Sequence, residues 1–261
     1  MSRGRARVPI LMYHDVSPQA APGFRKYTVT PRAFAMQMTW LALAGYTSVS
    51  MDRYLASRTG NQELPRKPVV ITFDDGFADC VRYAVPVLKA RGMTAVFFLV
   101  AGLMGGQSEW LRAERGVALE LMDWATAKRL AAEGFEIGAH SLTHPHLTVL
   151  SEAECRAELA ESRRVLEQGL ATEIRHLAYP YGSVDDRVMK LAGEAGYRTA
   201  CSVEIGFSGD RDPLLSLHRV PVTGLDSFPD FVCRLAAARP VREMMQRASD
   251  RFGRTMAEVT R

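Results

Sequence analysis

The chain has 261 residues, of which 47% are hydrophobic and 24% are charged, and its formal net charge is +4. These values are ordinary for a soluble globular protein and give no sign of a membrane protein. Arginine supplies 28 of the 33 cationic side chains, but the arginines are spread along the chain without a basic block interleaved with aromatic residues. We therefore do not expect nucleic acid binding.

The N-terminal segment contains three arginines, followed by an apolar run at residues 8–13. This run is too short for a signal peptide or a membrane span. The four cysteines are far apart and form no Cys-x-x-Cys pair, so we expect reduced, packed thiols. The sequence thus predicts no transmembrane segment and a cytoplasmic location.

Short apolar runs alternate with segments of helical spacing along the chain. Thr30-Pro31 and Asp123 are typical helix starts, and Ser151 with Glu154 forms the pattern of a capping box. The segment 101–118 is expected to form a surface loop, or alternatively a rim or lid over a site. Strands are predicted at residues 8–13, 47–49, 69–73, 94–100, 135–139, 177–179, 197–203 and 215–222, and helices at 31–44, 50–57, 81–91, 123–133, 151–168, 184–194 and 228–238.

This alternation repeats about seven times without a break in composition, which favours a single α/β barrel-like domain. We expect a short extension at residues 1–7, one domain at 8–240 and a helical tail at 241–261. Residues 16–30 are expected to form a loop.

Two adjacent carboxylates, Asp74 and Asp75, directly follow the buried strand at residues 69–73. The carboxyl ends of parallel strands are where α/β folds place their chemistry. Successive side chains at a strand end diverge, so the two carboxylates are expected to have different tasks. The plain alternative is that Asp-Asp-Gly forms an ordinary turn.

Two histidines, His140 and His144, follow the strand at residues 135–139. One Asp and two His are a common ligand set for a hydrolytic divalent metal ion, which keeps an open position for water. We therefore expect Asp75, His140 and His144 to bind a metal ion and Asp74 to act as a general base. The His-x-x-x-His spacing brings both rings to one face if the loop makes a helical turn that ends at His144.

Other polar positions at strand ends are candidates for substrate contacts. Pro180, Tyr181 and Gly182 form a tight turn whose backbone N–H could face an oxyanion. His14 follows the first strand, where it could contact the substrate. His218 could serve as general acid for the leaving amine, although the alternation of its strand leaves its face undecided.

Three segments, Thr72-Phe73-Asp74-Asp75-Gly76, His140-Ser141-Leu142-Thr143-His144 and Tyr179-Pro180-Tyr181-Gly182, resemble the motifs of the polysaccharide deacetylase family, the NodB-homology domain of carbohydrate esterase family 4. The resemblance covers roughly residues 8–222 and includes Met-Tyr-His-Asp-Val at 12–16. It implies a distorted (β/α)7 barrel and metal-dependent removal of acetyl groups from N-acetylated sugars. By position it implies Asp74 as the base, Asp75, His140 and His144 as metal ligands, and the Tyr181 backbone as the oxyanion contact.

The sequence departs from the family pattern at Ala178, where many members carry an arginine that orients the base. Arg219 or Arg175 could supply this charge from another strand, and we favour Arg219 because it follows a strand-forming run. The motif that carries the acid histidine fits His218 only approximately.

We therefore expect a single-domain deacetylase that acts on a glycan of the N-acetylglucosamine type. The expected cofactor is Zn²⁺, with Co²⁺, Ni²⁺, Mn²⁺ or Fe²⁺ as alternatives. One rival function is an amidohydrolase acting on a small cyclic or linear amide. A second rival is a catalytically weak glycan-binding homologue. The glycan and the oligomeric state are left open by the sequence.

Overall fold

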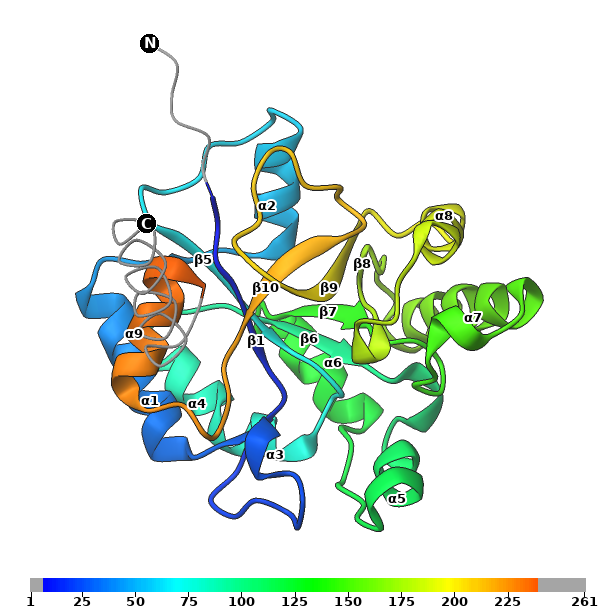
Figure 1. The fold of residues 1–261 in the computed structure, drawn as a ribbon, viewed down its shortest axis with the longest axis horizontal. Helices are drawn as coiled ribbons and strands as arrows, with labels where there is room; N and C mark the ends of the chain where they lie inside the picture. Colours follow the sequence, from blue (N-terminus) through cyan, green and yellow to red (C-terminus); the bar gives the residue numbers. More distant parts are fainter. Residues whose placement is uncertain (1–6, 239–261) are drawn as a thin grey trace, which may run out of the picture.

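Seven parallel strands close into a ring in the computed structural model, which describes residues 7–238 (Figure 1). The ring runs β1-β10-β9-β8-β7-β6-β5 and returns to β1, while the short strand β4 pairs with β5. The predicted α/β barrel of a single domain is thus confirmed for the described residues. The ring strands and β4 are β1 (Ile10–Tyr13), β4 (Thr47–Ser48), β5 (Pro68–Phe73), β6 (Val96–Leu99), β7 (Glu136–Ala139), β8 (His176–Ala178), β9 (Thr199–Ile205) and β10 (Leu217–Pro221).

Helices cover the outside of the ring, and their starts follow the predicted caps. The Thr30 side chain accepts a hydrogen bond from Ala33 N, and Ser151 and Glu154 form the expected capping box. The helices are α1 (Pro31–Leu43), α2 (Met51–Arg58), α3 (Ala78–Tyr83), α4 (Val85–Lys89), α5 (Glu109–Arg115), α6 (Trp124–Ala132), α7 (Glu152–Leu170), α8 (Asp186–Glu194) and α9 (Phe228–Ala237).

Alternation along the strands divides the core into two parts. Side chains that point outward, such as Ile71 and Phe97, pack with the surrounding helices in the larger cluster. Side chains that point inward, such as Val70 and Phe98, form a smaller cluster inside the ring, which also includes Tyr54 of α2. Because side chains alternate with period two, every second residue of a strand reaches the barrel interior.

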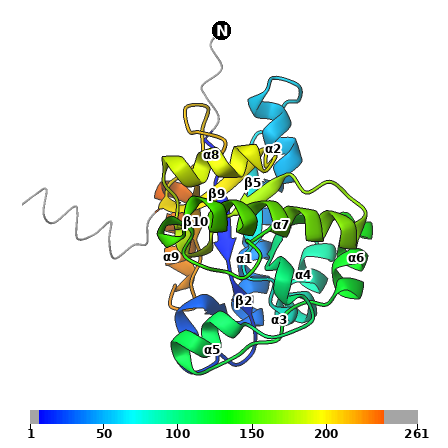
Figure 2. The same ribbon diagram turned by 90° about the vertical axis from the view of Figure 1, so that its right-hand side faces the viewer.

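Two stretches expected to be loops contain regular structure. The stretch 16–30 contains the second residue of β2 (Asp15–Val16), its partner strand β3 (Thr28–Val29) and the 3₁₀ turn η1 (Arg25–Tyr27). Residues 101–118 contain the 3₁₀ turn η2 (Ala101–Leu103) and helix α5. In Figures 1 and 2, α5 and β2 lie at the end of the barrel opposite α2.

The predicted helix at residues 81–91 is two helices, α3 and α4. Pro86 stands in the first turn of α4, and a proline has no N–H with which to continue the hydrogen bonds of α3. The four cysteines are free thiols, as predicted, and three of them are buried. Within residues 7–238, no helix has the length and apolar character needed to cross a membrane. Nearly all of the N-terminal extension and the whole of the expected tail at 241–261 lie outside the described residues.

Candidate active site

Three side chains of the kinds that bind metal ions converge at the carboxyl ends of β5 and β7. Asp75 Oδ1 lies 3.2 Å from the Nε2 atoms of both His140 and His144, and the three ligand atoms lie within 4.8 Å of one another. All three side chains are buried. Although burial alone would raise its pKa, contacts to the two imidazoles hold the pKa of Asp75 well below its usual range. The chemistry and spacing of this set fit a divalent cation such as Zn²⁺.

His140 has the orientation that a metal-binding imidazole requires. Its Nδ1 lies 2.7 Å from the carbonyl oxygen of Ala178 on the neighbouring strand β8. Donation of the Nδ1 proton to this carbonyl would leave the lone pair of Nε2 available to an ion held between His140 and Asp75, and such outer partners fix the tautomer of a metal ligand.

The loop that carries His144 is not a helical turn, so that expectation was wrong. Ser141 and His144 both have positive φ angles, 62° and 69°, and a run of αR residues cannot contain them. Instead, Glu158 of α7 accepts hydrogen bonds from the backbone N–H groups of Leu142 and Thr143 at 2.9 and 3.0 Å. This helix carboxylate therefore fixes the shape of the loop.

Aromatic contacts hold the His144 ring in place. The ring stacks on Trp110 of α5 at 4.3 Å between centroids and meets the edge of Tyr181 at 4.6 Å. Tyr181 has a φ of 57° in the turn that follows β8, and its hydroxyl hydrogen bonds Glu114 of α5. Pro180 and Gly182 shape this turn, but neither residue lines the cavity described below.

The second carboxylate, Asp74, is clamped by a buried arginine. Arg219 Nη1 and Nη2 donate to the two Asp74 oxygens at 2.7 and 2.8 Å, and the Arg219 side chain is fully buried. Burial raises the pKa of Asp74, but Arg219 and His140 outweigh it and hold that pKa below its ordinary value. Arg175, the other candidate, instead pairs with Asp52 and Glu173.

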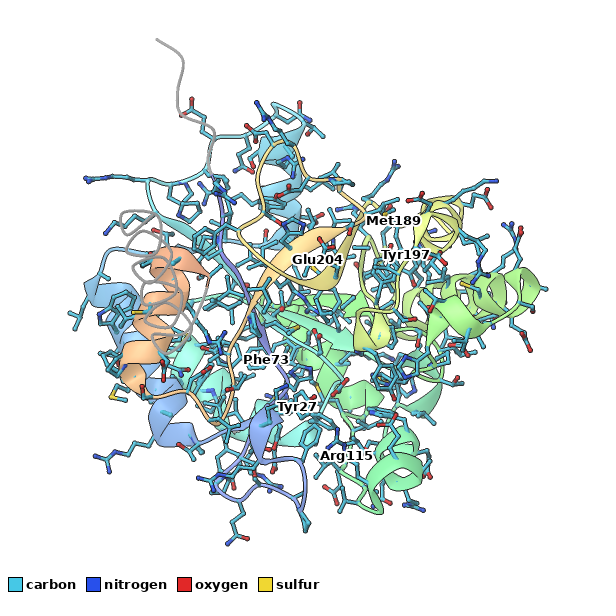
Figure 3. The ribbon with its side chains drawn as sticks, viewed as in Figure 1. Tyr27, Phe73, Arg115, Met189, Tyr197 and Glu204 are labelled. Carbon is cyan, nitrogen blue, oxygen red and sulfur yellow. The ribbon has the colours of Figure 1, made fainter. Side chains whose placement is uncertain are left out.

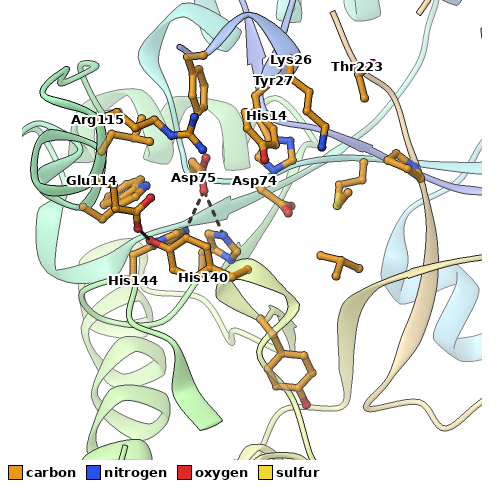
Figure 4. Close-up of a pocket in the computed structure, with 18 of the residues that line it drawn as sticks. His14, Lys26, Tyr27, Asp74, Asp75, Glu114, Arg115, His140, His144 and Thr223 are labelled. Carbon is orange, nitrogen blue, oxygen red and sulfur yellow. Dashed lines mark hydrogen bonds and ion pairs between the residues drawn. The ribbon is translucent and has the colours of Figure 1, made fainter. Parts of the chain in front are cut away.

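These groups open into a cavity of about 330 Å³. His14 lines it beside Asp74 (Figure 4), and burial lowers the pKa of His14 while Asp75 and Asp74 act against this shift. Part of the wall comes from segments that sequence reasoning assigned to loops: Phe24, Lys26 and Tyr27 before β3, and Trp110, Leu111, Glu114 and Arg115 of α5.

His218 does not lie where the general-acid prediction needs it. Its Nε2 contacts Glu204 at 2.7 Å, and it is absent from the cavity wall. Leu217 belongs to the interior cluster and Arg219 reaches Asp74, so His218, between them on β10, points to the other face of the strand. Glu204 itself lies well away from Tyr27 and Arg115 in Figure 3.

Several residues of the site could not be found from sequence motifs. The wall residues of α5 follow Ser108 and precede Gly116, whose φ of 68° ends the helix, and this Ser-to-Gly spacing was the available signal for a short helix. Glu158 carried no signal, since an acidic residue on an amphipathic helix is usually exposed to solvent.

Comparison with known proteins gives consistent matches over most of the chain. YxkH of Bacillus subtilis (strain 168) is 29% identical over 218 residues, which cover 84% of this chain and 72% of that protein. A poly-beta-1,6-N-acetyl-D-glucosamine N-deacetylase of Staphylococcus aureus is 24% identical over 189 residues, or 69% of this chain and 62% of that protein. The solved structure of the Streptococcus pyogenes deacetylase PplD, in complex with acetate, matches with a TM-score of 0.78 and 25% identity, covering 91% of this chain and all of that one.

The family model for polysaccharide deacetylase matches residues 61–200, more than half of the chain. The matched segment contains Asp74, Asp75, His140, His144 and the turn at Tyr181, which together build most of the site described above. The chain therefore belongs to the polysaccharide deacetylase family.

Proposed function

We propose that the protein removes N-acetyl groups from an N-acetylated glycan of the N-acetylglucosamine type, with a divalent metal ion, Zn²⁺ by our expectation, as cofactor. The observation that supports this most strongly is the placement of Asp75, His140 and His144 beside a second carboxylate, Asp74, that Arg219 holds in place. Two similar proteins support N-deacetylation: the structure of PplD contains acetate, and the staphylococcal relative is a deacetylase of poly-beta-1,6-N-acetyl-D-glucosamine. The corresponding domain is proposed to span residues 8–240.

In this proposal Asp75, His140 and His144 hold the metal ion. When bound there, a divalent ion polarises a carbonyl and makes water a stronger acid. The remaining work falls to the side chains and backbone of the chain itself.

Asp74 is the general base. Its carboxylate is charged because Arg219 lowers its pKa, and it can therefore accept a proton from water as that water attacks the acetyl carbonyl carbon. Arg219 acts as a positioning residue, since its two N–H groups fix the carboxylate plane. The cavity floor thus presents a base of fixed orientation.

The backbone N–H of Tyr181 is proposed to contact the oxyanion that forms on the acetyl group. As the C–N bond breaks, the amine needs a proton and acetate leaves. With His218 outside the cavity, we assign proton delivery to His14, which lines the cavity beside Asp74 and passes to the amine the proton that Asp74 takes from water.

The test measures acetate released from chitooligosaccharides by the native chain, by the same chain after chelation and metal return, and by Asp74→Asn. We expect chelation to abolish release and metal return to restore it. We expect Asp74→Asn to lose about 10²- to 10⁴-fold in turnover while it binds as much metal as the native chain.

Asp210→Asn is the matched control, because Asp210 is exposed and far from the cavity wall; we expect it to keep native turnover. Full turnover by Asp74→Asn would refute the assignment of the base. Glycan binding without acetate release would favour a catalytically weak binding protein, and release from a small cyclic amide alone would favour the amidohydrolase alternative.

A further inference from the structure

The mouth of the cavity carries two cations on one side. Lys26 and Arg115 both line the cavity and both are exposed. Lys26 Nζ lies 5.5 Å and Arg115 Cζ lies 5.6 Å from the centre of the same ring, that of Tyr27. We call Lys26, Tyr27 and Arg115 the basic rim, and Figure 4 shows Lys26 and Arg115 on either side of Tyr27, directed toward the cavity.

The two cations of the basic rim lack acidic partners. In the part of the chain that the structure describes, neither Lys26 nor Arg115 has a carboxylate within 4.0 Å. Arg115 Nη1 donates to the carbonyl oxygen of Gly23 at 2.9 Å, which anchors the guanidinium without neutralising it. Two like charges beside one ring repel each other, and an anion placed against them would relieve that repulsion.

The mouth also carries an acidic group, Glu114, the neighbour of Arg115 on α5. Glu114 also lines the cavity, but its carboxylate accepts a hydrogen bond from the Tyr181 hydroxyl. Tyr181 in turn stacks on His146 at 3.9 Å and meets His144. The acidic group of the mouth is therefore hydrogen-bonded to Tyr181, whereas the two cations lie against the Tyr27 ring.

The charges on the cavity floor do not cancel those of the basic rim. Asp74 is neutralised by Arg219, and Asp75 faces the two imidazoles. A glycan whose acetamide reaches these carboxylates would have its neighbouring sugar at the mouth, where an aromatic ring flanked by cations can support a sugar and an acidic substituent together.

We propose that the basic rim binds an acidic group, a carboxylate or a phosphate, on the sugar next to the one that is deacetylated. This inference rests on the proposed deacetylase function and narrows its substrate to acidic glycans. The two sources of negative charge share the same recognition chemistry, and the experiment separates them.

The experiment compares kcat/KM for acetate release from three glycans of equal length. One is a neutral chitooligosaccharide, one alternates N-acetylglucosamine with glucuronic acid, and one is a chitooligosaccharide that carries a phosphate. For the native chain we expect one or both acidic glycans to be preferred over the neutral one. For Lys26→Gln/Arg115→Gln we expect this preference to fall about tenfold, chiefly through KM, because two exposed charge contacts are worth up to about fivefold each.

Arg112→Gln is the matched control. Arg112 lies on the same helix as Arg115 and is exposed, but it pairs with Glu109 and does not line the cavity. We expect it to keep the native preference. We also expect 0.5 M NaCl to reduce the native preference and to leave that of the double variant nearly constant, because salt screens exposed charges.

The larger preference, for the uronic acid or for the phosphate glycan, identifies the acidic group. Acetate release from all three glycans with no preference that depends on Lys26 and Arg115 would overturn the inference and leave the proposed function intact. If no glycan releases acetate, the proposed function fails, and calorimetric binding of the acidic glycans decides the inference. Weaker binding by the double variant then supports it, and equal binding overturns it.

Discussion

Two clusters of carboxylates and imidazoles lie at opposite ends of the barrel. We call Asp75, His140 and His144, at the carboxyl ends of the strands, the upper cluster. We call Asp52, Glu136 and His176, at the end of the barrel where α2 lies, the lower cluster. In both clusters the ligand atoms lie within 4.8 Å of one another. Strand β7 links them, since Glu136 begins the strand and His140 follows its end. By residue type and spacing alone, both clusters could be metal sites.

The hydrogen bonds of the lower cluster distinguish it from the upper one. The Glu136 carboxylate accepts from the backbone N–H groups of Met51 and Asp52 at 2.5 and 2.9 Å, and so caps the N-terminus of α2. Asp52 accepts from Arg175 at 2.8 Å, and His176 lies 3.2 Å from Asp52. These carboxylates already have donors, and the guanidinium of Arg175 repels a second cation.

In the upper cluster, by contrast, the ligand atoms of Asp75, His140 and His144 point toward one place, and the three side chains line a cavity. Donor type and distance alone therefore do not define a metal centre. What defines it is whether lone pairs remain available once the backbone and neighbouring cations have been satisfied.

The largest expected difference is in activity. Asp75→Ala should lower both the rate of acetate release and the metal affinity. The loss should exceed the roughly 10- to 100-fold that is typical when a residue that only hydrogen-bonds a metal ligand is removed. Asp52→Ala, which removes a carboxylate from the lower cluster, should keep both within about twofold. Acetate release and elemental analysis of the two variants measure this difference; loss of metal from Asp52→Ala alone would reverse the roles of the clusters.

The next difference is in the free energy of unfolding and compares two arginines. Arg219→Met should destabilise the fold by about 3–5 kcal/mol, because it leaves Asp74 as a buried charge without its partner. Arg175→Met should cost less than about 1 kcal/mol, since Arg175 and Asp52 are both more than a third exposed. Urea unfolding of both variants checks this, and equal costs would argue against a special role for burial at Asp74.

A smaller effect concerns the cap of α2. Glu136→Ala removes the acceptor of two backbone N–H groups and should cost about 1–3 kcal/mol in the free energy of unfolding. Its kcat should stay close to the native value, because the lower cluster is remote from the cavity. A melting curve and an acetate assay on the same sample give both quantities, and a large fall in kcat with intact folding would contradict a purely structural role.

The smallest effect is a pH dependence at the same residue. Burial raises the pKa of Glu136 above its ordinary value of 4.5, so its stabilising contribution is present below pH 4.5 and is lost as the pH rises through the folded pKa. Glu136→Gln does not titrate. We expect its free energy of unfolding, relative to the native chain, to be higher at pH 8 than at pH 5; a difference that does not change with pH would show that the pKa is not raised.

The sequence allowed most of the upper site to be predicted because Asp74, Asp75 and His140 come at the ends of apolar strands. Asp74 continues the inward alternation of Val70 and Thr72, and His140 follows the last residue of β7. The predicted barrel is confirmed for the same reason, since the apolar runs are the strands. Local pattern was sufficient wherever a residue directly extends a strand.

The rest depended on tertiary structure. Alternation puts Leu217 and Arg219 on one face of β10 and His218 on the other. Which of the two faces points inward is decided by tertiary contacts, namely the packing of Leu217 inside the ring and the ion pair of Arg219 with Asp74. The wall of the cavity was missed for a similar reason, because Arg115 comes to the Tyr27 ring only through the packing of α5 against the segment before β3.

We propose that the upper cluster, and not the lower one, holds a divalent ion. Anomalous diffraction from crystals of the native chain grown with Zn²⁺ would locate the ion. We expect an anomalous peak between Asp75, His140 and His144 and none between Asp52, Glu136 and His176. A peak at the lower cluster with none at the upper one, or no peak at either, would show that the upper cluster is not the metal site.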